Sequence, residues 1–292
     1  MQAYKKITEE ITINEQLKML TQAYQEHAIV QINFARYSVI SSREFMEELD
    51  EIFFNVKTSY QTYLEAIREK REAKTIRNLH KNGKDVLILL SSNGKFYGDL
   101  ITKVCRLFAE QAKTTKADLV IVGKEGKKFF EQTGIKKPFA YFEIPDTNVT
   151  LNMLKPLIHQ IIVYQKVSIF YGKFDNIIIQ EPVESSLSGD MPNMQKDEEE
   201  KDKKANFLFE PTVEHIMEFF ESQIFSLLLN QTVNEGKLAR FASRVKAMEL
   251  AQNNIQKQIT FLTHRERRIK SMEMNKKQLQ LFAGRRLWGK SR

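Results

Sequence analysis

The chain is poor in glycine and proline, the two residues that most often interrupt a helix. Its 292 residues include 11 glycines and 6 prolines, about half of the roughly 12% that average usage gives. Neither residue occurs between Met1 and Asn82, and only Gly236 occurs between Thr212 and Ala283. Because these residues mark helix ends and turns, very long helices are predicted at both ends of the chain.

Cysteine and long apolar runs are also scarce. The lone Cys105 excludes an internal disulfide framework and fits a reducing compartment. No run of about 18 apolar residues is present to span a membrane. The first twelve residues lack the apolar core of a signal peptide, so secretion is not expected.

The first 82 residues carry an apolar stripe with steps of three and four, close to the coiled-coil period. Ser41 and Glu44 match a capping box, which predicts that the helix breaks or bends near residues 41–44. The stripe consists of Ile13, Leu17, Leu20, Tyr24, Ala28, Ile32, Ala35, Val39, Met46, Leu49, Phe53, Val56, Tyr60, Leu64 and Ile67.

The middle of the chain, residues 83–184, alternates short apolar segments with helical patterns. Alternation at this spacing predicts a parallel or mixed sheet covered by helices. Helices are expected at about 98–113, 124–133 and 150–164. The strand candidates are Asp85–Ser92, Ala117–Gly123, Phe139–Ile144, Val167–Tyr171 and Ile177–Gln180.

Residues 185–209 are polar and charged, which predicts a flexible loop, with a last strand-like piece at 206–210. The apolar stripe then returns in residues 210–292, from Leu238 to Phe282. Two long terminal helices separated by an α/β segment can bury their stripes only against each other. The predicted fold is therefore α/β with a long antiparallel coiled coil, formed by the N- and C-terminal helices, and a Rossmann-like α/β head inserted between them.

The positive charge is concentrated at one end. The chain carries 45 Lys and Arg against 37 Asp and Glu, a net charge of +8, and beyond Gly236 there are 15 basic and 3 acidic residues. A rod with one basic end favours an acidic partner. Nucleic acid is not expected, because few aromatic residues accompany the basic ones for stacking on bases.

No catalytic, cofactor or metal-binding pattern is present. The glycine-lysine turns at Gly94–Gly98 and Gly123–Lys128 lack the spacing of a phosphate-binding loop or a dinucleotide fold. The five histidines are scattered, without the paired spacing of metal ligands. Ser91-Ser92 has no neighbouring base motif. An enzyme is therefore not expected, and no cofactor is predicted.

Several segments, in order, resemble the γ subunit of F-type rotary ATP synthases. Ala242–Asn254 is similar to the family's AARMxAMxxAxxNA segment, and Leu20–Ala28 to its ITKAMxMVA helix. Three stretches in the middle of the chain are also similar to family motifs. Leu90–Gly98 is similar to LSSDRGLCG, Val122–Phe130 to VGxKGxxFF, and Ile169–Phe174 to IYNxF.

The resemblance implies a mechanical role. In that family the terminal helices fill the central hole of a hexamer of α and β subunits and couple ATP hydrolysis or synthesis to rotation. The partners implied are α- and β-like subunits, with one copy of this chain per hexamer, an ε-like subunit and a membrane rotor. The implied location is cytoplasmic, at the inner face of the cell membrane. Candidates for hexamer contact are Leu20, Thr21, Ala23, Arg240, Arg244, Met248, Ala251, Gln252 and Asn254.

The chain also departs from the family pattern. Arg240 stands where the family usually has Glu, and Tyr24 and Glu26 stand where it has Met. These departures favour a paralogous F-type-like ATPase complex of a small-genome bacterium, linked to surface work such as gliding motility. Two alternatives stay open on the residues alone: a stand-alone coiled-coil adaptor and a basic nucleic-acid-binding protein.

Overall fold

A computed structural model describes residues 2–68, 82–187 and 213–288. The chain divides into two compact units. We call residues 1–28 with 244–292 the coiled-coil unit and residues 29–243 the sheet unit.

Two long helices, α1 (Gln2–Arg68) and α5 (Val213–Trp288), run through both units. Their lengths follow from the near absence of glycine and proline in these segments. The break predicted near residues 41–44 is not found, because α1 is continuous there; a bend at these residues stays a prediction. Ser41 and Glu44 match a capping box, but nothing in the local sequence stops the preceding turn from continuing.

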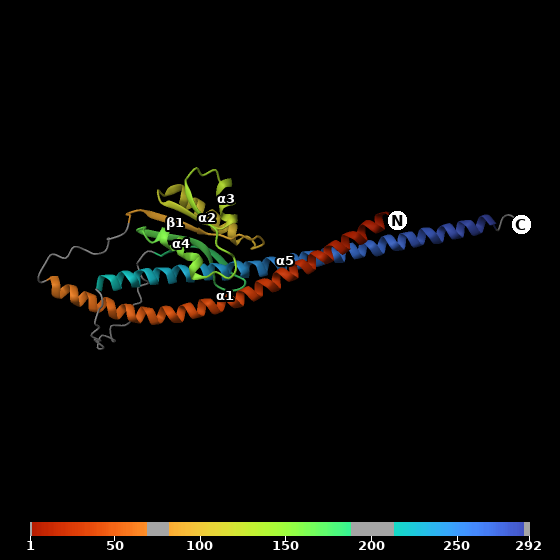
Figure 1. Cartoon of the computed structure of the whole chain (residues 1–292). Coiled ribbons are helices and arrows are strands. Elements are labelled where there is room, and N and C mark those ends of the chain that lie inside the picture. Colours follow the sequence, from red (N-terminus) through yellow and green to blue (C-terminus); the bar gives the residue numbers. More distant parts are fainter. Residues whose placement is uncertain (1, 69–81, 188–212, 289–292) are drawn as a thin grey trace. The chain divides into compact units, whose positions relative to one another are not determined.

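In the coiled-coil unit the two helices are antiparallel, and Figure 1 shows the start of α1, in red, beside α5, in blue, which continues beyond it. Thr8 Oγ1 donates to Glu266 Oε1 at 3.2 Å, and Lys18 Nζ donates to Gln256 Oε1 at 2.7 Å. Residue numbers thus rise along α1 as they fall along α5, which confirms the predicted antiparallel coiled coil. The apolar residues buried in this unit are Ile7, Ala28, Val245, Met248 and Leu262.

The seam of the coiled coil is less apolar than the stripe predicted. Ile13, Leu17 and Leu20 are 55%, 45% and 53% exposed. The two polar pairs named above supply some of the contacts between the helices instead. The predicted stripe therefore has the right period, but three of its large side chains lie half in solvent.

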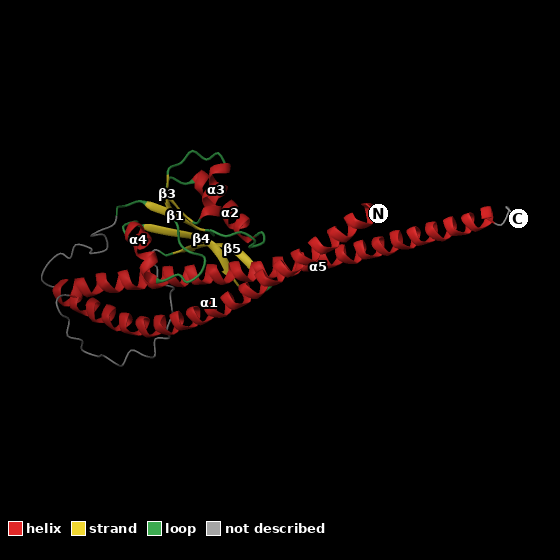
Figure 2. Cartoon of the chain, turned by 45° about the vertical axis from the view of Figure 1, so that its right-hand side comes forward, coloured by secondary structure: helices red, strands yellow, loops and turns green. Residues whose placement is uncertain are grey.

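The sheet unit contains a five-stranded sheet in the order β3-β2-β1-β4-β5. The first three strand pairs, β1–β2, β1–β4 and β2–β3, are parallel, and β5 runs antiparallel to β4. Figure 2 shows the sheet in yellow with helices against it. The strands are β1 (Asp85–Leu90), β2 (Asp118–Val122), β3 (Phe139–Phe142), β4 (Lys166–Phe174) and β5 (Gln180–Ser186).

Both faces of the sheet are covered. Alternate residues of β1 point to opposite faces, so Val86, Ile88 and Leu90 pack with α4 (Leu151–Ile161), whereas Leu87 and Leu89 pack with α2 (Leu100–Thr114) and α3 (Lys124–Gln132). Helix α5 contributes to both cores: Leu229 and Val233 to the first, and Ala239 to the second.

The last strand differs from its prediction. The apolar triplet Ile177-Ile178-Ile179 forms the turn between β4 and β5, and β5 begins only at Gln180. Asn176 Oδ1 accepts hydrogen bonds from the backbone N–H groups of Ile178 and Ile179, both at 2.8 Å. This side-chain-to-backbone turn competes with strand geometry. The predicted piece at 206–210, and all but the first few residues of the predicted loop 185–209, lie outside the described residues.

Candidate functional site

The strand order places a topological switch point between β1 and β4. From β1 the chain moves outward through β2 and β3, and then returns to the other side of β1 as β4. In open α/β sheets, ligands bind in the crevice outside the carboxyl ends of the strands at such a point. A ligand site would therefore be expected at this edge of the sheet.

Ser91, directly after β1, is the centre of this edge. Its hydroxyl donates to the Val122 carbonyl at 2.7 Å and accepts from the Gly126 N–H at 2.9 Å. The Ser92 carbonyl accepts from the Glu125 N–H at 2.9 Å. The ends of β1, β2 and the first turn of α3 are thereby joined.

Ser91 lies so close to Gly123 and Gly126 that neither glycine leaves room for a larger residue. A Cβ at Gly126 would lie 2.5 Å from Ser91 Oγ, and one at Gly123 would lie 2.7 Å from it. Gly123 also has φ 97°, a conformation that favours glycine. Both glycines are thus required for the close approach of α3 to β1.

The polar groups of the loop after Ser92 are bound by other groups of the chain. Asp146 accepts from the N–H groups of Asn93 and Gly94, the latter at 2.6 Å. Asn93 Oδ1 accepts from the Lys124 N–H at 3.0 Å. In nucleotide-binding folds a phosphate takes the donors at such a helix start. Here the chain itself binds three of these donors: the N–H groups of Lys124, Glu125 and Gly126 donate to Asn93 Oδ1, the Ser92 carbonyl and Ser91 Oγ.

Helix α5 also contacts this edge of the sheet. Arg240 Nη1 donates to the Ser91 carbonyl at 3.0 Å, and Ser243 Oγ donates to the Tyr97 carbonyl at 2.8 Å. The rings of Tyr97 and Phe241 meet edge to face, with centroids 5.8 Å apart. A helix of the same chain thus lies against the edge at which ligands bind in open α/β sheets.

Burial perturbs two titratable groups beside these contacts. Burial, and then the Glu235 carboxylate, raises the pKa of the Tyr171 hydroxyl, which donates to Glu235 Oε2 at 3.2 Å. Burial, and then the neighbouring Arg240 guanidinium, lowers the pKa of Lys237. Perturbed groups often accompany catalytic sites, but here each shift has a packing origin, at the junction of α5 with the sheet.

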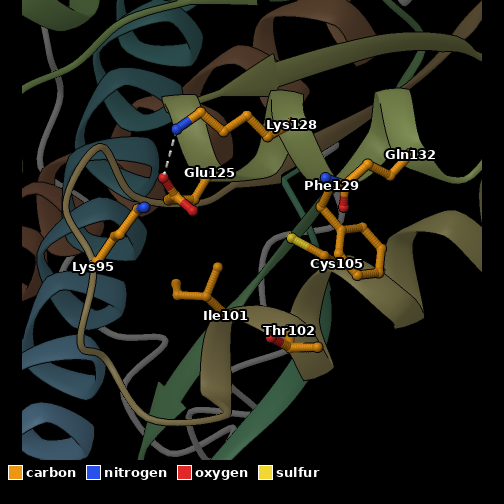
Figure 3. Close-up of a pocket in the computed structure, with 8 residues that line it drawn as sticks. All are labelled: Lys95, Ile101, Thr102, Cys105, Glu125, Lys128, Phe129 and Gln132. Carbon is orange, nitrogen blue, oxygen red and sulfur yellow. Dashed lines mark hydrogen bonds and ion pairs between the residues drawn. The ribbon is translucent and has the colours of Figure 1, made fainter.

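A second hollow of about 290 Å³ lies between α2 and α3 (Figure 3). Lys95 and an ion pair between Lys128 and Glu125, at 3.1 Å, lie on one side of it. Cys105 lies on the other side. Within the part of the chain that the structure describes, no group of three or more His, Cys, Asp or Glu residues is placed to hold a metal ion.

The structure separates the nine predicted contact residues by exposure. Leu20, Ala23 and Asn254 are exposed, and Thr21, Ala251 and Gln252 are half-buried. Arg240, Arg244 and Met248 are buried, at 6%, 7% and 6% exposure. Within the coiled-coil unit, Gln252 Nε2 donates to Gln25 Oε1 at 2.6 Å, and the Arg244 guanidinium lies 5.9 Å from the centre of the Tyr24 ring.

Arg240 is the residue whose surroundings sequence reasoning missed. It was predicted as a contact for a partner ring, yet its guanidinium lies in the sheet unit and binds the end of β1. Ser91, Ser243 and Asp146 were not predicted as parts of one arrangement. The signal available was the serine pair directly after a buried strand, but its partner lies about 150 residues further along the chain.

Comparisons with known proteins identify what the chain is similar to. A family model described as ATP synthase matches residues 3–273. The ATP synthase gamma chain of Halothermothrix orenii is 22% identical over 295 residues, covering 97% of this chain and 98% of the relative. That of Bdellovibrio bacteriovorus is 20% identical over 300 residues, with the same coverage.

Solved structures show the same fold. A chain of the central stalk and c-ring structure of the Tetrahymena thermophila mitochondrial ATP synthase matches with a TM-score of 0.57 and 15% identity, over 80% of this chain and 99% of that chain. A chain of the Euglena gracilis mitochondrial ATP synthase matches with a TM-score of 0.52 and 12% identity, over 89% and 96%. No helix among the described residues has the length and apolarity to cross a membrane.

Proposed function

Since the chain belongs to the ATP synthase family, we propose that it is the gamma-type central shaft of a rotary ATPase and carries no catalytic site itself. The observation that carries the proposal is the antiparallel coiled coil of α1 and α5, on a chain that matches gamma chains over 97% of its length. Rotation would then be its contribution to ATP synthesis or hydrolysis.

The coupling works through contacts that differ between orientations. A ring of α- and β-like subunits surrounding the coiled-coil unit meets a different set of side chains at each of its interfaces. As the unit turns, the contact free energy of each interface changes, and with it the nucleotide affinity of that interface. A helix pair suits this role because its backbone hydrogen bonds are satisfied internally along its whole length.

The exposed members of the predicted contact set are the best candidates to touch the ring. Leu20, Ala23 and Asn254 present side chains to solvent. Arg244 and Met248 lie within the coiled-coil unit and would act by shaping its surface. Beyond Gly236 there are 15 basic and 3 acidic residues, and this positive charge would favour binding to acidic groups on the ring.

Further partners follow from the same family. An ε-like subunit and a membrane rotor would bind outside the ring, which would hold the complex at the inner face of the cell membrane. No cofactor is required of this chain, because nucleotide would bind in the ring.

The finer proposal is a paralogous F-type-like complex of a small-genome bacterium, linked to surface work such as gliding motility. Its support is the set of residue departures, including Arg240 in place of the family's Glu. A gene neighbourhood with Walker-motif ATPase subunits and without proton-channel subunits would support it. Deletion of the gene should then reduce movement without reducing ATP synthesis; loss of ATP synthesis would assign the chain to the housekeeping complex.

Co-purification tests the main proposal. A tagged full-length chain, expressed at its native level, should recover α- and β-like subunits at three each per copy of this chain. Nucleotide hydrolysis should be found in the complex and not in the isolated chain. A stable complex without such subunits would contradict the proposal.

The stand-alone adaptor remains the second candidate, because Ile13, Leu17 and Leu20 are about half exposed in the coiled-coil unit. It predicts that the isolated chain self-associates through these residues, as seen by sedimentation. The shaft proposal predicts that the ring covers them instead, so that Ile13→Gln with Leu17→Gln should weaken ring assembly and leave the sedimentation of the isolated chain unchanged.

A further inference from the structure

Helix α5 crosses the carboxyl edge of the sheet within the sheet unit. Leu229 and Val233 pack in the core on one face, and Ala239 packs in the core on the other face. Gly236 lies between them, where a Cβ would be 3.6 Å from the ring of Tyr171 on β4, in ordinary contact. The helix therefore passes over the switch point between β1 and β4.

Two side chains fix α5 just after this crossing. Arg240 and Ser243 each donate to a backbone carbonyl, of Ser91 and Tyr97, at 3.0 and 2.8 Å. They are 6% and 5% exposed. Hydrogen bonds with a charged donor are stronger than neutral ones, and a buried geometry holds both partners in place. The two bonds act at two separate points of the loop that follows β1.

The residue that accepts from Arg240, Ser91, is itself held by hydrogen bonds. Ser91 is joined to β2 through Val122 and to α3 through Gly126. A force on the Ser91 carbonyl is thereby shared by two strands and a helix. A loop residue without such bonds would yield instead.

We propose that Arg240 and Ser243 lock residues 213–243 of α5 onto the carboxyl edge of the sheet, so that this part of the helix and the sheet move as one body. Arg240 is the main positioning residue, because it reaches the rigid end of β1. The inference rests on the proposed rotor function only for its mechanical meaning. The lock itself is a property of the isolated chain.

Hydrogen exchange on the isolated, full-length chain tests the lock. Arg240→Met removes the donors and keeps an apolar stem, Arg240→Lys keeps a charged donor, and Ser243→Ala removes the second bond. Arg268→Met, at an exposed position on the same helix, is the matched control. Amides of 91–97 and 235–243 should exchange on the order of tenfold faster in Arg240→Met, with partial rescue in Arg240→Lys.

A second readout separates locking from mere stabilisation. Arg240→Met leaves the buried Ser91 carbonyl without its donor, so the melting temperature of the variant should also fall. The discriminating readout is therefore where exchange becomes faster: the lock predicts faster exchange at 91–97 and 235–243 and not over all amides. Exchange rates within twofold of the parent in both Arg240→Met and Ser243→Ala would overturn the lock. A uniform rise over all amides that tracks a lower melting temperature would also overturn it.

In an assembled ring the lock has a mechanical signature. A bead attached at Glu131→Cys on α3, in a chain with Cys105→Ala, reports the angle of the sheet while the ring holds the shaft. Angular fluctuations should widen at least twofold in Arg240→Met and stay unchanged in Arg268→Met. Unchanged fluctuations in Arg240→Met would contradict the lock. Failure of the parent chain to assemble with any ring would contradict the proposed function, and the exchange experiment would still decide the lock.

Discussion

Among single side chains, Cys105 gives the most direct test of the packing between α2 and α3. It is 1% exposed, and burial, followed by the Glu125 carboxylate, raises the pKa of its thiol to about 12. Only the thiolate reacts with alkylating reagents. Alkylation by iodoacetamide at pH 8 should therefore be on the order of a thousandfold slower in the folded chain than in denaturant. Equal rates would show that this part of the sheet unit opens freely.

Tyr171 makes stability depend on alkaline pH. Its pKa is raised above the ordinary value of 10.0, by burial and then by Glu235. The folded chain therefore keeps a proton that the unfolded chain loses above pH 10, so the stabilisation is complete below pH 10 and is lost as the pH rises further. From pH 8 to pH 10.5, urea unfolding should show a larger loss of stability in the parent than in Tyr171→Phe.

In the comparison with Tyr171→Phe, the contributions of the other titrating groups to the pH dependence of stability cancel. Lys237, whose pKa is lowered by burial and then by Arg240, acts with the opposite sign, because its unfolded form binds more protons. It is present in both proteins and cancels in the difference. At pH 8 the variant itself should lose about 1 kcal/mol with the hydrogen bond to Glu235. Parallel stability curves for the two proteins would contradict the assignment.

At the scale of whole elements, two glycines on different helices should respond oppositely to alanine. Gly126 holds α3 against the end of β1, and a Cβ there would lie 2.5 Å from Ser91 Oγ and 2.8 Å from Ser91 Cβ. Gly126→Ala should lower the free energy of unfolding by about 1–3 kcal/mol through overpacking. Gly236 lies inside α5 with room for a methyl group, so Gly236→Ala should raise it by up to about 1 kcal/mol.

Urea unfolding of both glycine variants beside the parent measures these effects. Circular dichroism should show unchanged helix content in each. A stabilised Gly126→Ala would mean that α3 can move away from β1 without loss. A strongly destabilised Gly236→Ala would mean that the crossing of α5 over Tyr171 is tighter than the distances indicate.

Elements with a clear local pattern were predictable from the sequence. β1 and β2 are uninterrupted apolar runs, and the structure places them at Asp85–Leu90 and Asp118–Val122, within the predicted ranges. The long helices followed from missing glycine and proline. The triplet Ile177–Ile179 has the composition of a strand, but the hydrogen bonds to Asn176 hold it as a turn. Composition alone does not distinguish the two.

The arrangement at the crevice was not predictable, because its parts are distant along the chain. Arg240 belongs by spacing to a basic helix expected to face a partner, and nothing local indicates that it is buried. Its acceptor, the carbonyl of Ser91, is a backbone atom and leaves no mark in the sequence. Side-chain types and their spacing identify helices and strands, whereas a contact between a side chain and a distant backbone requires the three-dimensional structure.

For the whole molecule, the surface and the interior of the coiled-coil unit should behave differently on mutation. Leu20 and Asn254 are exposed, so replacing both with alanine should leave the melting temperature of the isolated chain within about 2 °C of the parent, because exposed substitutions change stability by at most about 0.5 kcal/mol. In the assembled complex the same double variant should lower the torque or the coupled ATPase rate. Single-molecule rotation and steady-state hydrolysis measure these quantities.

A second double variant, Arg244→Ala with Gln252→Ala, changes residues that make contacts within the coiled-coil unit. Gln252 binds Gln25 and Arg244 is buried beside Tyr24, so this variant should weaken both coupling and the stability of the coiled-coil unit. Coupling that survives unchanged in both variants would remove these residues from the ring-facing surface. If coupling falls in a variant and is restored at high salt, then the charges of the shaft and the ring repel one another at this surface, because salt screens the repulsion.

The crossing of α5 over the sheet also constrains how the chain can fold as it is synthesised. The last strand ends at Ser186, yet the two cores of the sheet unit still lack Leu229, Val233 and Ala239. At roughly 5–20 residues per second, the ribosome needs several more seconds to deliver them. During that interval the carboxyl edge of the sheet is complete in backbone but open, with apolar side chains uncovered on both faces. This nascent state is the one in which a chaperone would be most needed.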